Sequence, residues 1–272
     1  MASVQIPSLS KRGESFSRRR LSVVKERFLS DDCTDDPWNL LDLPCPLPGT
    51  LPNFLMGENC QLLHRIRDQV LRGDTVDRTV ASREDWNEWK DVEHWVLLAQ
   101  AGALTLRHQD SHGFGTWITV QEGRVGLGWM SRPTDQELRA WMADPVNDTG
   151  GKLRYVVLVP GQTIFIPSGV VHFVFRLAGQ NQQTLCLGGH IFQWSSLDVW
   201  MGVILGQLRF PNTTNEETRA TIPKYVDIVV KLVSQRQKCG RVEELGGEET
   251  ISRFFALYKV RTQSVDMAME HS

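Results

Sequence analysis

A chain of 272 residues is long for one compact domain and short for two large ones, so we expect one core domain with additions. Hydrophobic residues make up 41% of the chain and charged residues 23%, near the average for globular proteins, which excludes a disordered or fibrous chain. The formal net charge of −2 excludes a global attraction to nucleic acid or to an anionic membrane.

The cysteines and the hydropathy set further limits. The five cysteines are an odd number and form no CxxC pair, which argues against a disulfide framework and a structural zinc site. We therefore expect reduced thiols in a nuclear or cytoplasmic protein. We expect no membrane span, because no apolar run approaches ~20 residues, and no secretory signal at the N-terminus.

Residues 1–30 are rich in Ser and Arg, and we predict a disordered basic tail. The basic cluster of Lys11, Arg12 and Arg18 to Arg20 also fits a nuclear address or a transit peptide. All three interpretations stay open at this point.

Residues 31–95 are predicted to form a Pro-rich strap and a small helical preface. The prolines between Pro37 and Pro52 forbid a long helix or a central strand, yet the Trp, Leu and Phe side chains among them favour burial. We therefore predict an extended strap over a core. The apolar spacing predicts a helix over residues 59–71, and residues 85–95 are predicted as a second short helix or a helix that runs into a strand.

Residues 96–194 are predicted to form the β core. Short runs of β-branched and aromatic residues alternate here with Gly, Pro, Asn and Asp, a pattern typical of a sandwich or barrel. Between two of these runs, residues 134–151 are predicted to be a helix capped by Thr134 and then a loop.

Residues 195–272 return to the helical period and are predicted to form a helical C-terminal extension. Its apolar stripes run through five positions, Val199, Ile204, Leu208, Val229 and Leu232. The stripes fit packing on the barrel, and they equally fit the seam of a homodimer.

The sequence TLRHQD, at the end of a predicted strand, holds the first candidate metal ligands. Residues two apart on a strand point to the same face, so His108 and Asp110 are predicted to reach one metal together. His172 lies 62 residues after Asp110 and follows a GQTIFIPSG turn that would bring it across the barrel. Two imidazoles and one carboxylate on one side of a metal are the facial triad of non-haem iron(II) oxygenases.

Two other histidines of the predicted β core are His112 and His190. His112 would share the strand face with Asp110, but the sequence SHGFG around it favours a loop. His190 lies where the sheet ends and is predicted to pack or to form a hydrogen bond.

At these residues the sequence resembles the JmjC family of iron(II)- and 2-oxoglutarate-dependent oxygenases, nearest to its histone lysine demethylase-like branch. The resemblance runs from about Trp95 to Phe192 and rests on TLRHQD, TWITVQEGRVGLGWMSRPT, PGQTIFIPSGVVHFVF and LCLGGHIF. It implies a mainly β fold with helical additions: a double-stranded β-helix, or cupin-like jelly roll, flanked by N-terminal and C-terminal helices. It also implies two sets of site residues: His108, Asp110 and His172 as iron ligands, and Thr105 as a hydroxyl contact to the distal carboxylate of 2-oxoglutarate.

The chain departs from the family pattern at the co-substrate site. The family's lysine, about seventeen residues after the first His, is Val125 here, and the aromatic hydroxyl that often follows the Trp is replaced by Ile118. A carboxylate that enters a barrel without a cation loses hydration that nothing replaces. Either another cation takes that role, or 2-oxoglutarate binds weakly or not at all. The candidate cations, each of which also fits a surface position, are Arg176, Arg107 and Arg124.

Three functions fit these residues. The first is an oxygenase that uses iron(II) and 2-oxoglutarate to hydroxylate or demethylate a protein, a histone lysine among them, or a small molecule. The alternative is a JmjC-like binding or scaffold protein that keeps the metal site and has lost 2-oxoglutarate turnover, which Val125 and Ile118 favour. The three intact ligands favour the oxygenase. A third reading, an oxygenase without 2-oxoglutarate, fits the same residues. The expected partner is a protein or small-molecule substrate, with no strong sign of nucleic-acid or membrane binding.

Overall fold

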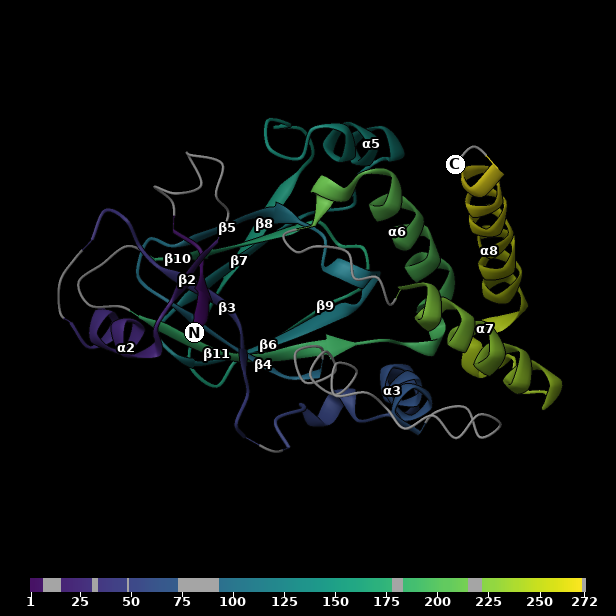
Figure 1. Ribbon diagram of the computed structural model, residues 1–272, viewed down its shortest axis with the longest axis horizontal. Coiled ribbons are helices and arrows are strands. Elements are labelled where there is room, and N and C mark those ends of the chain that lie inside the picture. The colour runs from purple at the N-terminus through teal and green to yellow at the C-terminus, as the bar shows by residue number, and fades with distance from the viewer. Residues whose placement is uncertain are drawn as a thin grey trace.

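Two antiparallel sheets face each other at the centre of the computed structural model (Figure 1). The structure describes residues 1–6, 16–30, 34–47, 49–72, 93–177, 183–214 and 222–270. The strands of the two sheets are β3 to β11, at Asn39–Pro44, Trp95–Ala99, Leu104–His108, Gly115–Glu122, Val125–Met130, Leu153–Leu158, Thr163–Ile166, His172–Arg176 and Thr184–Ile191.

The order of these strands identifies the fold. One sheet has the order β5-β10-β7-β8, and the other has the order β3-β4-β11-β6-β9. From β4 to β11 the chain passes back and forth between the sheets, and only β7 and β8 follow each other within one sheet. Eight strands wound in this way in two facing sheets form a jelly roll of the cupin type. The predicted fold class, a mainly β double-stranded β-helix with helical additions, is confirmed.

The inner faces of the two sheets form the core of the barrel. Along β4 and β10 every second residue is buried, as expected for strands with one face inward. Val125 and Ile118, the two positions that depart from the family pattern, lie in this apolar cluster. The Pro-rich segment contributes β3, whose place at the edge of its sheet is the position that proline tolerates.

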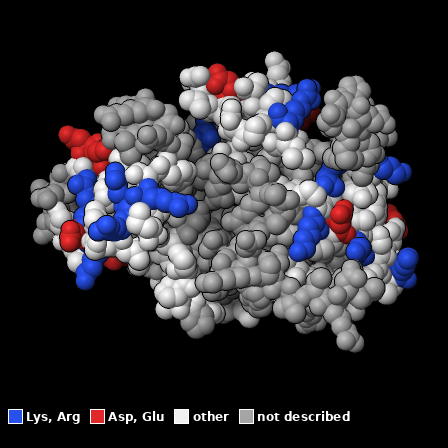
Figure 2. All heavy atoms as spheres, in the orientation of Figure 1, with Lys and Arg blue, Asp and Glu red and all other residues white. Residues whose placement is uncertain are grey.

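The described parts of residues 1–30 are folded, in place of the predicted disordered tail. Strands β1 (Ala2–Val4) and β2 (Ser17–Arg19) pair, and α2 (Leu21–Leu29) follows. The segment has few apolar residues, but they meet in one cluster: Ala2, Val4, Ile6, Val24, Phe28 and Leu40. A mean composition does not show that spacing, which is why the prediction was wrong. Figure 2 shows Lys and Arg side chains gathered on the outer surface over α2.

The longer helices lie around the barrel and at one end of it (Figure 1). They are α3 at Leu62–Arg72, α5 at Asp135–Ala143, α6 at Leu197–Arg209, α7 at Ile222–Lys238 and α8 at Gly247–Glu270. Helix α5 begins at a capping box in which Thr134 and Glu137 bond each other's backbone N–H, as the sequence predicted for Thr134. Most of the helix predicted at residues 85–95 lies outside the described residues, which resume at residue 93. No described helix is both long enough and apolar enough to span a bilayer.

Helix α6 uses a different face from the one predicted. Val199 and Leu208 are about half exposed, with 48% and 52% of their surface accessible, so the predicted packing of these two residues on the barrel was wrong, and the homodimer seam stays a prediction. The buried face instead runs through Leu197, Trp200 and Ile204, at the three- and four-residue steps of a helix. These residues pack with α3, α7 and α8 and with the end of the barrel in one apolar cluster.

Candidate metal centre

The three predicted metal ligands converge at one end of the barrel. His108 ends β5 and His172 begins β10, and the strand register pairs them directly. Nε2 of His108 lies 3.9 Å from Oδ1 of Asp110, and Nε2 of His172 lies 3.7 Å from the same oxygen. One ligating atom from each of the three residues falls within 4.8 Å of the others, and no other such group occurs in the described parts of the chain.

Asp110 reaches the cluster from a turn and not from a strand face. Strand β5 ends at His108, and the backbone N–H of Gln109 donates to the carbonyl of Thr213 instead of continuing the sheet. Asp110 then begins the short 3₁₀ turn Ser111–Gly113. The predicted juxtaposition of His108 and Asp110 therefore holds, but its reason is a turn stabilised from outside the sheet.

Hydrogen bonds fix the orientation of both imidazoles. Nδ1 of His108 lies 2.8 Å from the carbonyl oxygen of Leu106, and Nδ1 of His172 lies 3.0 Å from that of Val170. A carbonyl only accepts, so each Nδ1 carries the proton and donates it. Each Nε2 then presents its lone pair toward Asp110, which is the form of histidine that binds a metal.

The carboxylate of Asp110 is oriented through its second oxygen. The Thr116 hydroxyl donates to Oδ2 at 2.7 Å, while Oδ1 faces the two histidines. Nδ1 of His190 lies 2.9 Å from the same hydroxyl, so His190 forms the hydrogen bond that the sequence predicted for it. The side-chain amide of Gln207 on α6 donates to the Asp110 carbonyl at 2.7 Å. Sequence reasoning did not identify Thr116 or Gln207, because no motif marks them.

His112 lies outside the metal-ligand group. Its φ of 61° places it in the left-handed region, so the chain turns away after Asp110. Its ring is stacked on Phe114, with 5.9 Å between centroids, and its carbonyl accepts a 2.8 Å hydrogen bond from the indole N–H of Trp200. The loop interpretation of His112 agrees with this placement.

A cavity of about 40 Å³ adjoins the three ligands between the two sheets. Thr105 lines it, although an odd spacing of three residues from His108 would ordinarily put the two on opposite faces. A register shift in the β5–β10 pairing, a bulge, brings both inward. The Thr105 hydroxyl accepts a 3.0 Å bond from the Asn39 amide, which leaves its own proton for an acceptor in the cavity. The cavity is lined by Leu41, Trp95, Leu97, Thr105, His108, Asp110, Thr116, Ile118, His172, Val174, Arg176 and His190.

The three candidate cations have different surroundings. Arg107 lies 3.4 Å from the carboxylate of Asp148, and Arg124 is exposed. Arg176 is 3% exposed and lines the cavity, and its Nε donates to the Thr184 hydroxyl at 3.2 Å. Burial lowers the pKa of Arg176. The surface position that also fitted the sequence is therefore wrong for Arg176.

Comparisons with known proteins confirm the resemblance read from the sequence. No family model matches the chain. A JmjC domain-containing histone demethylation protein 1 of Mycosarcoma maydis is 30% identical over 148 residues, which are 51% of this chain and 21% of the relative. The protein of the same name from Caenorhabditis elegans is 28% identical over 113 residues, 39% of this chain and 10% of the relative. The chain thus matches about a fifth and a tenth of the length of these JmjC relatives.

Comparisons with solved structures give only partial overlaps. The CENP-C cupin domain of Drosophila melanogaster is 11% identical, covers 36% of this chain and 59% of its own, and has a TM-score of 0.27. Cobalt(II)-loaded HppE in complex with substrate is 12% identical, covers 36% of this chain and 43% of its own, and has a TM-score of 0.23. The fold assignment here rests on the strand order of the two sheets.

Proposed function

We propose that the chain is an iron(II)-dependent oxygenase of the JmjC type that uses 2-oxoglutarate as co-substrate. The observation that supports this most directly is the convergence of His108, Asp110 and His172, two imidazoles and one carboxylate, beside a cavity. This ligand set suits iron(II) and leaves positions open for other ligands. Bound iron(II) would supply the activation of dioxygen, with one oxygen atom passing to succinate and the other to a C–H bond as carbon dioxide leaves 2-oxoglutarate.

The protein side chains have two tasks in this proposal. The backbone carbonyls of Leu106 and Val170 hold the histidines in the metal-binding tautomer, and the Thr116 hydroxyl holds the carboxylate. The apolar cavity wall, formed by residues such as Trp95 and Val174, excludes water from the reacting groups.

The substrate is proposed to be a protein side chain. The free space inside the barrel suits only a small molecule beside the metal, so a larger substrate approaches from outside and presents one group. The names of the two relatives make N-methyl lysine of a histone the first substrate to test. Hydroxylation of that methyl carbon would give a hydroxymethyl amine, whose C–N bond would break to release formaldehyde and leave the amine with one methyl group fewer. The protein would then act in the nucleus.

A binding or scaffold protein is the second candidate. Val125 is 1% exposed and Ile118 is 3% exposed within the apolar core, so neither position offers a polar group to a co-substrate. A protein with this site would bind a metal without turning over 2-oxoglutarate. The two candidates agree on metal binding and differ on co-substrate consumption.

The first test is the iron content of the purified protein after anaerobic loading. We expect about one iron(II) per chain, and loss of that iron in His108→Ala and in Asp110→Ala, because two remaining ligands do not define the site. His64→Ala, which removes a histidine on α3 far along the chain from the cluster, should keep its iron. Equal iron content in all four proteins would refute the assignment of the metal centre.

The second test separates the oxygenase from the scaffold. Iron-loaded protein is mixed with 2-oxoglutarate and oxygen, and succinate is measured with and without methylated histone peptides. Succinate formation above that of His172→Ala supports the oxygenase. Full iron content with no succinate under any condition would favour the scaffold.

A further inference from the structure

The barrel holds a buried cation for which the described residues supply no counter-ion. Arg176 is 3% exposed, and its Nη1 and Nη2 atoms have no hydrogen-bond partner in the described parts of the chain. Only its Nε is bonded, to the neutral hydroxyl of Thr184. The indole N–H of Trp95, which lines the same cavity, likewise finds no acceptor among the described residues. The cavity wall therefore has an excess of hydrogen-bond donors and of positive charge.

The neighbouring groups do not neutralise this charge. Arginine stays protonated in proteins, so its burial carries a large desolvation cost. Cys186 is close enough to interact with it, but burial raises the pKa of that thiol to about 11, so the thiol is neutral at pH 7. Asp110, the one acid among the described residues that line the cavity, has its oxygens directed at the two histidines and at Thr116. The structure thus has a place for an anion that the described side chains do not fill.

Strand geometry relates this place to the metal centre. His172, Val174 and Arg176 alternate along β10 on its inward face, and the Cα atoms of His172 and Arg176 are about 13 Å apart at strand spacing. Thr105, with a hydroxyl proton to donate, lies opposite Val174 on β5. The cavity therefore has metal ligands at one end, a hydroxyl between, and a guanidinium at the other end.

We propose that Arg176 binds the distal carboxylate of a short dicarboxylic 2-oxo acid whose keto acid end faces the metal centre, with Thr105 as a second donor to that carboxylate. This inference rests on the proposed function, and it names the residue that selects the co-substrate. A guanidinium with two free nitrogens matches the two oxygens of a carboxylate. The distal carboxylate of the ligand would be the counter-ion that the described residues do not supply.

The register of the sheet explains why a valine can stand at position 125, where the family pattern has a lysine. Val125 on β7 is the direct partner of Arg176 on β10. Side chains of directly paired residues lie on the same face and next to each other. A cation from either position would reach the same part of the cavity, so with Arg176 present a second cation at Val125 would add like-charge repulsion.

The test compares two acids that share the keto acid end. The iron(II)-loaded protein is titrated without oxygen, and binding is followed by the visible charge-transfer band of the chelate, with 2-oxoglutarate in one arm and pyruvate in the other. We expect 2-oxoglutarate to bind at least tenfold more tightly than pyruvate, because pyruvate lacks the distal carboxylate. In Arg176→Met this preference should disappear while iron content stays unchanged.

Two further variants control for the fold and for charge. Arg124→Met, the same change at an exposed neighbour of Val125, should keep the wild-type preference. Arg176→Met combined with Val125→Lys should regain at least part of it, because the cation returns from the paired strand. The melting temperature of metal-free Arg176→Met should exceed that of the wild type, since an unpaired buried charge is removed.

The outcomes distinguish this inference from the proposed function. Equal affinity for the two acids in the wild type, or an unchanged preference in a folded Arg176→Met, would overturn the role of Arg176 and leave the iron site standing. A lower melting temperature in Arg176→Met with unchanged binding would show that Arg176 only supports the fold. Failure of the wild type to bind iron would instead count against the proposed function itself.

Discussion

The orientation of a single carboxylate depends on one hydroxyl. Thr116 donates to Oδ2 of Asp110 and accepts from His190, so the carboxylate has one oxygen fixed and the other free for a metal. We expect Thr116→Val, which keeps the shape of the side chain, to weaken iron(II) affinity about tenfold to a hundredfold, the range found when such supporting groups are removed. Competition with a metal-binding dye measures this affinity.

A matched control lies on the same strand. The hydroxyl of Thr119 bonds that of Thr163 at 2.7 Å and is not part of the metal cluster. Thr119→Val should therefore leave the metal affinity within about twofold of the wild type. An equal loss in both variants would mean that strand β6 is disturbed as a whole and that the Thr116 hydroxyl has no separate role.

At this scale the sequence predicts the candidate ligands better than it predicts the residues that would support them. The convergence of His108, Asp110 and His172 was predictable because their residue types and spacing match one coordination chemistry. Arg176 was only one of three candidates, because a strand pattern does not say whether a charged side chain faces the core. Its proposed role depends on the absence of a nearby acid among the described residues, which only the folded chain shows.

At the scale of the elements, two glycines illustrate how packing decides the effect of one substitution. A Cβ at Gly188 on β11 would come within 1.9 Å of the Trp95 ring, which is 4% exposed and would have to shift. Gly188→Ala should lower the free energy of unfolding by about 1–3 kcal/mol, as overpacked cores do. A Cβ at Gly202 on α6 would meet nothing within 4 Å, so Gly202→Ala should raise it by about 0.5–1 kcal/mol through helix propensity alone.

Urea unfolding followed by circular dichroism distinguishes the two glycine variants. The midpoint should move down in Gly188→Ala and up in Gly202→Ala, with the wild type between them. A midpoint for Gly188→Ala at or above that of the wild type would contradict the tight contact between β11 and Trp95.

Element types were more predictable than the faces they bury. The alternating pattern predicts the strands of the core, and the capping box marks the start of α5. The buried face of α6 was predicted wrongly because the helix has more apolar residues than the neighbouring helices can bury. The sequence alone does not say which of these apolar residues stay exposed. Residues 1–30 were misread because β1 and β2 become stable only on pairing with each other and packing near Leu40.

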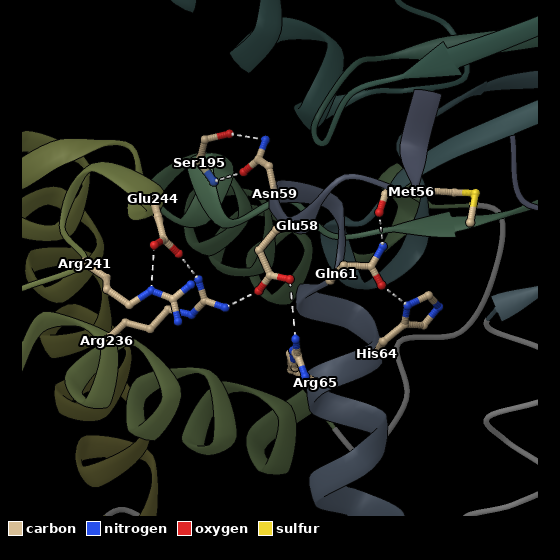
Figure 3. A network of polar contacts seen from close by, with 10 residues as sticks. All are labelled: Met56, Glu58, Asn59, Gln61, His64, Arg65, Ser195, Arg236, Arg241 and Glu244. Carbon is tan, nitrogen blue, oxygen red and sulfur yellow. Dashed lines mark hydrogen bonds and ion pairs between the residues drawn. The ribbon is translucent and has the colours of Figure 1, made fainter. Parts of the chain in front are cut away.

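On the scale of the whole molecule, polar contacts join the segment before the barrel to the helices after it (Figure 3). Glu58, in the 3₁₀ turn Glu58–Cys60, bonds Arg236 on α7 across 178 residues of sequence. The Asn59 amide and the Ser195 hydroxyl and N–H form two further bonds of 3.0 Å beside it. These contacts lie beside the apolar cluster in which α6 packs with α3, α7 and α8. Gln207 on α6 in turn donates a hydrogen bond to the backbone carbonyl of Asp110.

Arg236 is the centre of this connection. It bonds Glu244 as well as Glu58, and its guanidinium lies 3.8 Å from the centroid of the Trp194 ring. Arg241 bonds Glu244 from the other side at 2.6 Å. Glu58 therefore joins the segment before the barrel to α7, whereas Glu244 joins the end of α7 to the 3₁₀ turn Glu243–Leu245.

Glu58 gives this connection a pH dependence with a definite sign. The hydrogen bond from Arg236, more than any other influence, holds the pKa of Glu58 below its usual value of 4.5. A carboxyl with a lowered folded pKa stabilises the fold above its unfolded pKa, and that stability is lost as the pH falls through the folded pKa. Because the Glu58 side chain is 46% exposed, water screens the pair, and we expect a contribution of about 0.5 kcal/mol at pH 7.

Glu58→Gln tests the contribution of this charge. The variant should be less stable than the wild type by about 0.5 kcal/mol at pH 7, and the two should converge as the pH falls through the lowered pKa of Glu58, where the carboxyl becomes neutral. Raising the salt to about 1 M should also reduce the difference, because exposed charges are screened. Glu122→Gln, at an exposed carboxyl on β6, serves as the control and should match the wild type throughout. A difference for Glu58→Gln that persisted unchanged across the whole acid range in which the protein stays folded would show that side-chain shape, and not charge, joins the two ends of the fold.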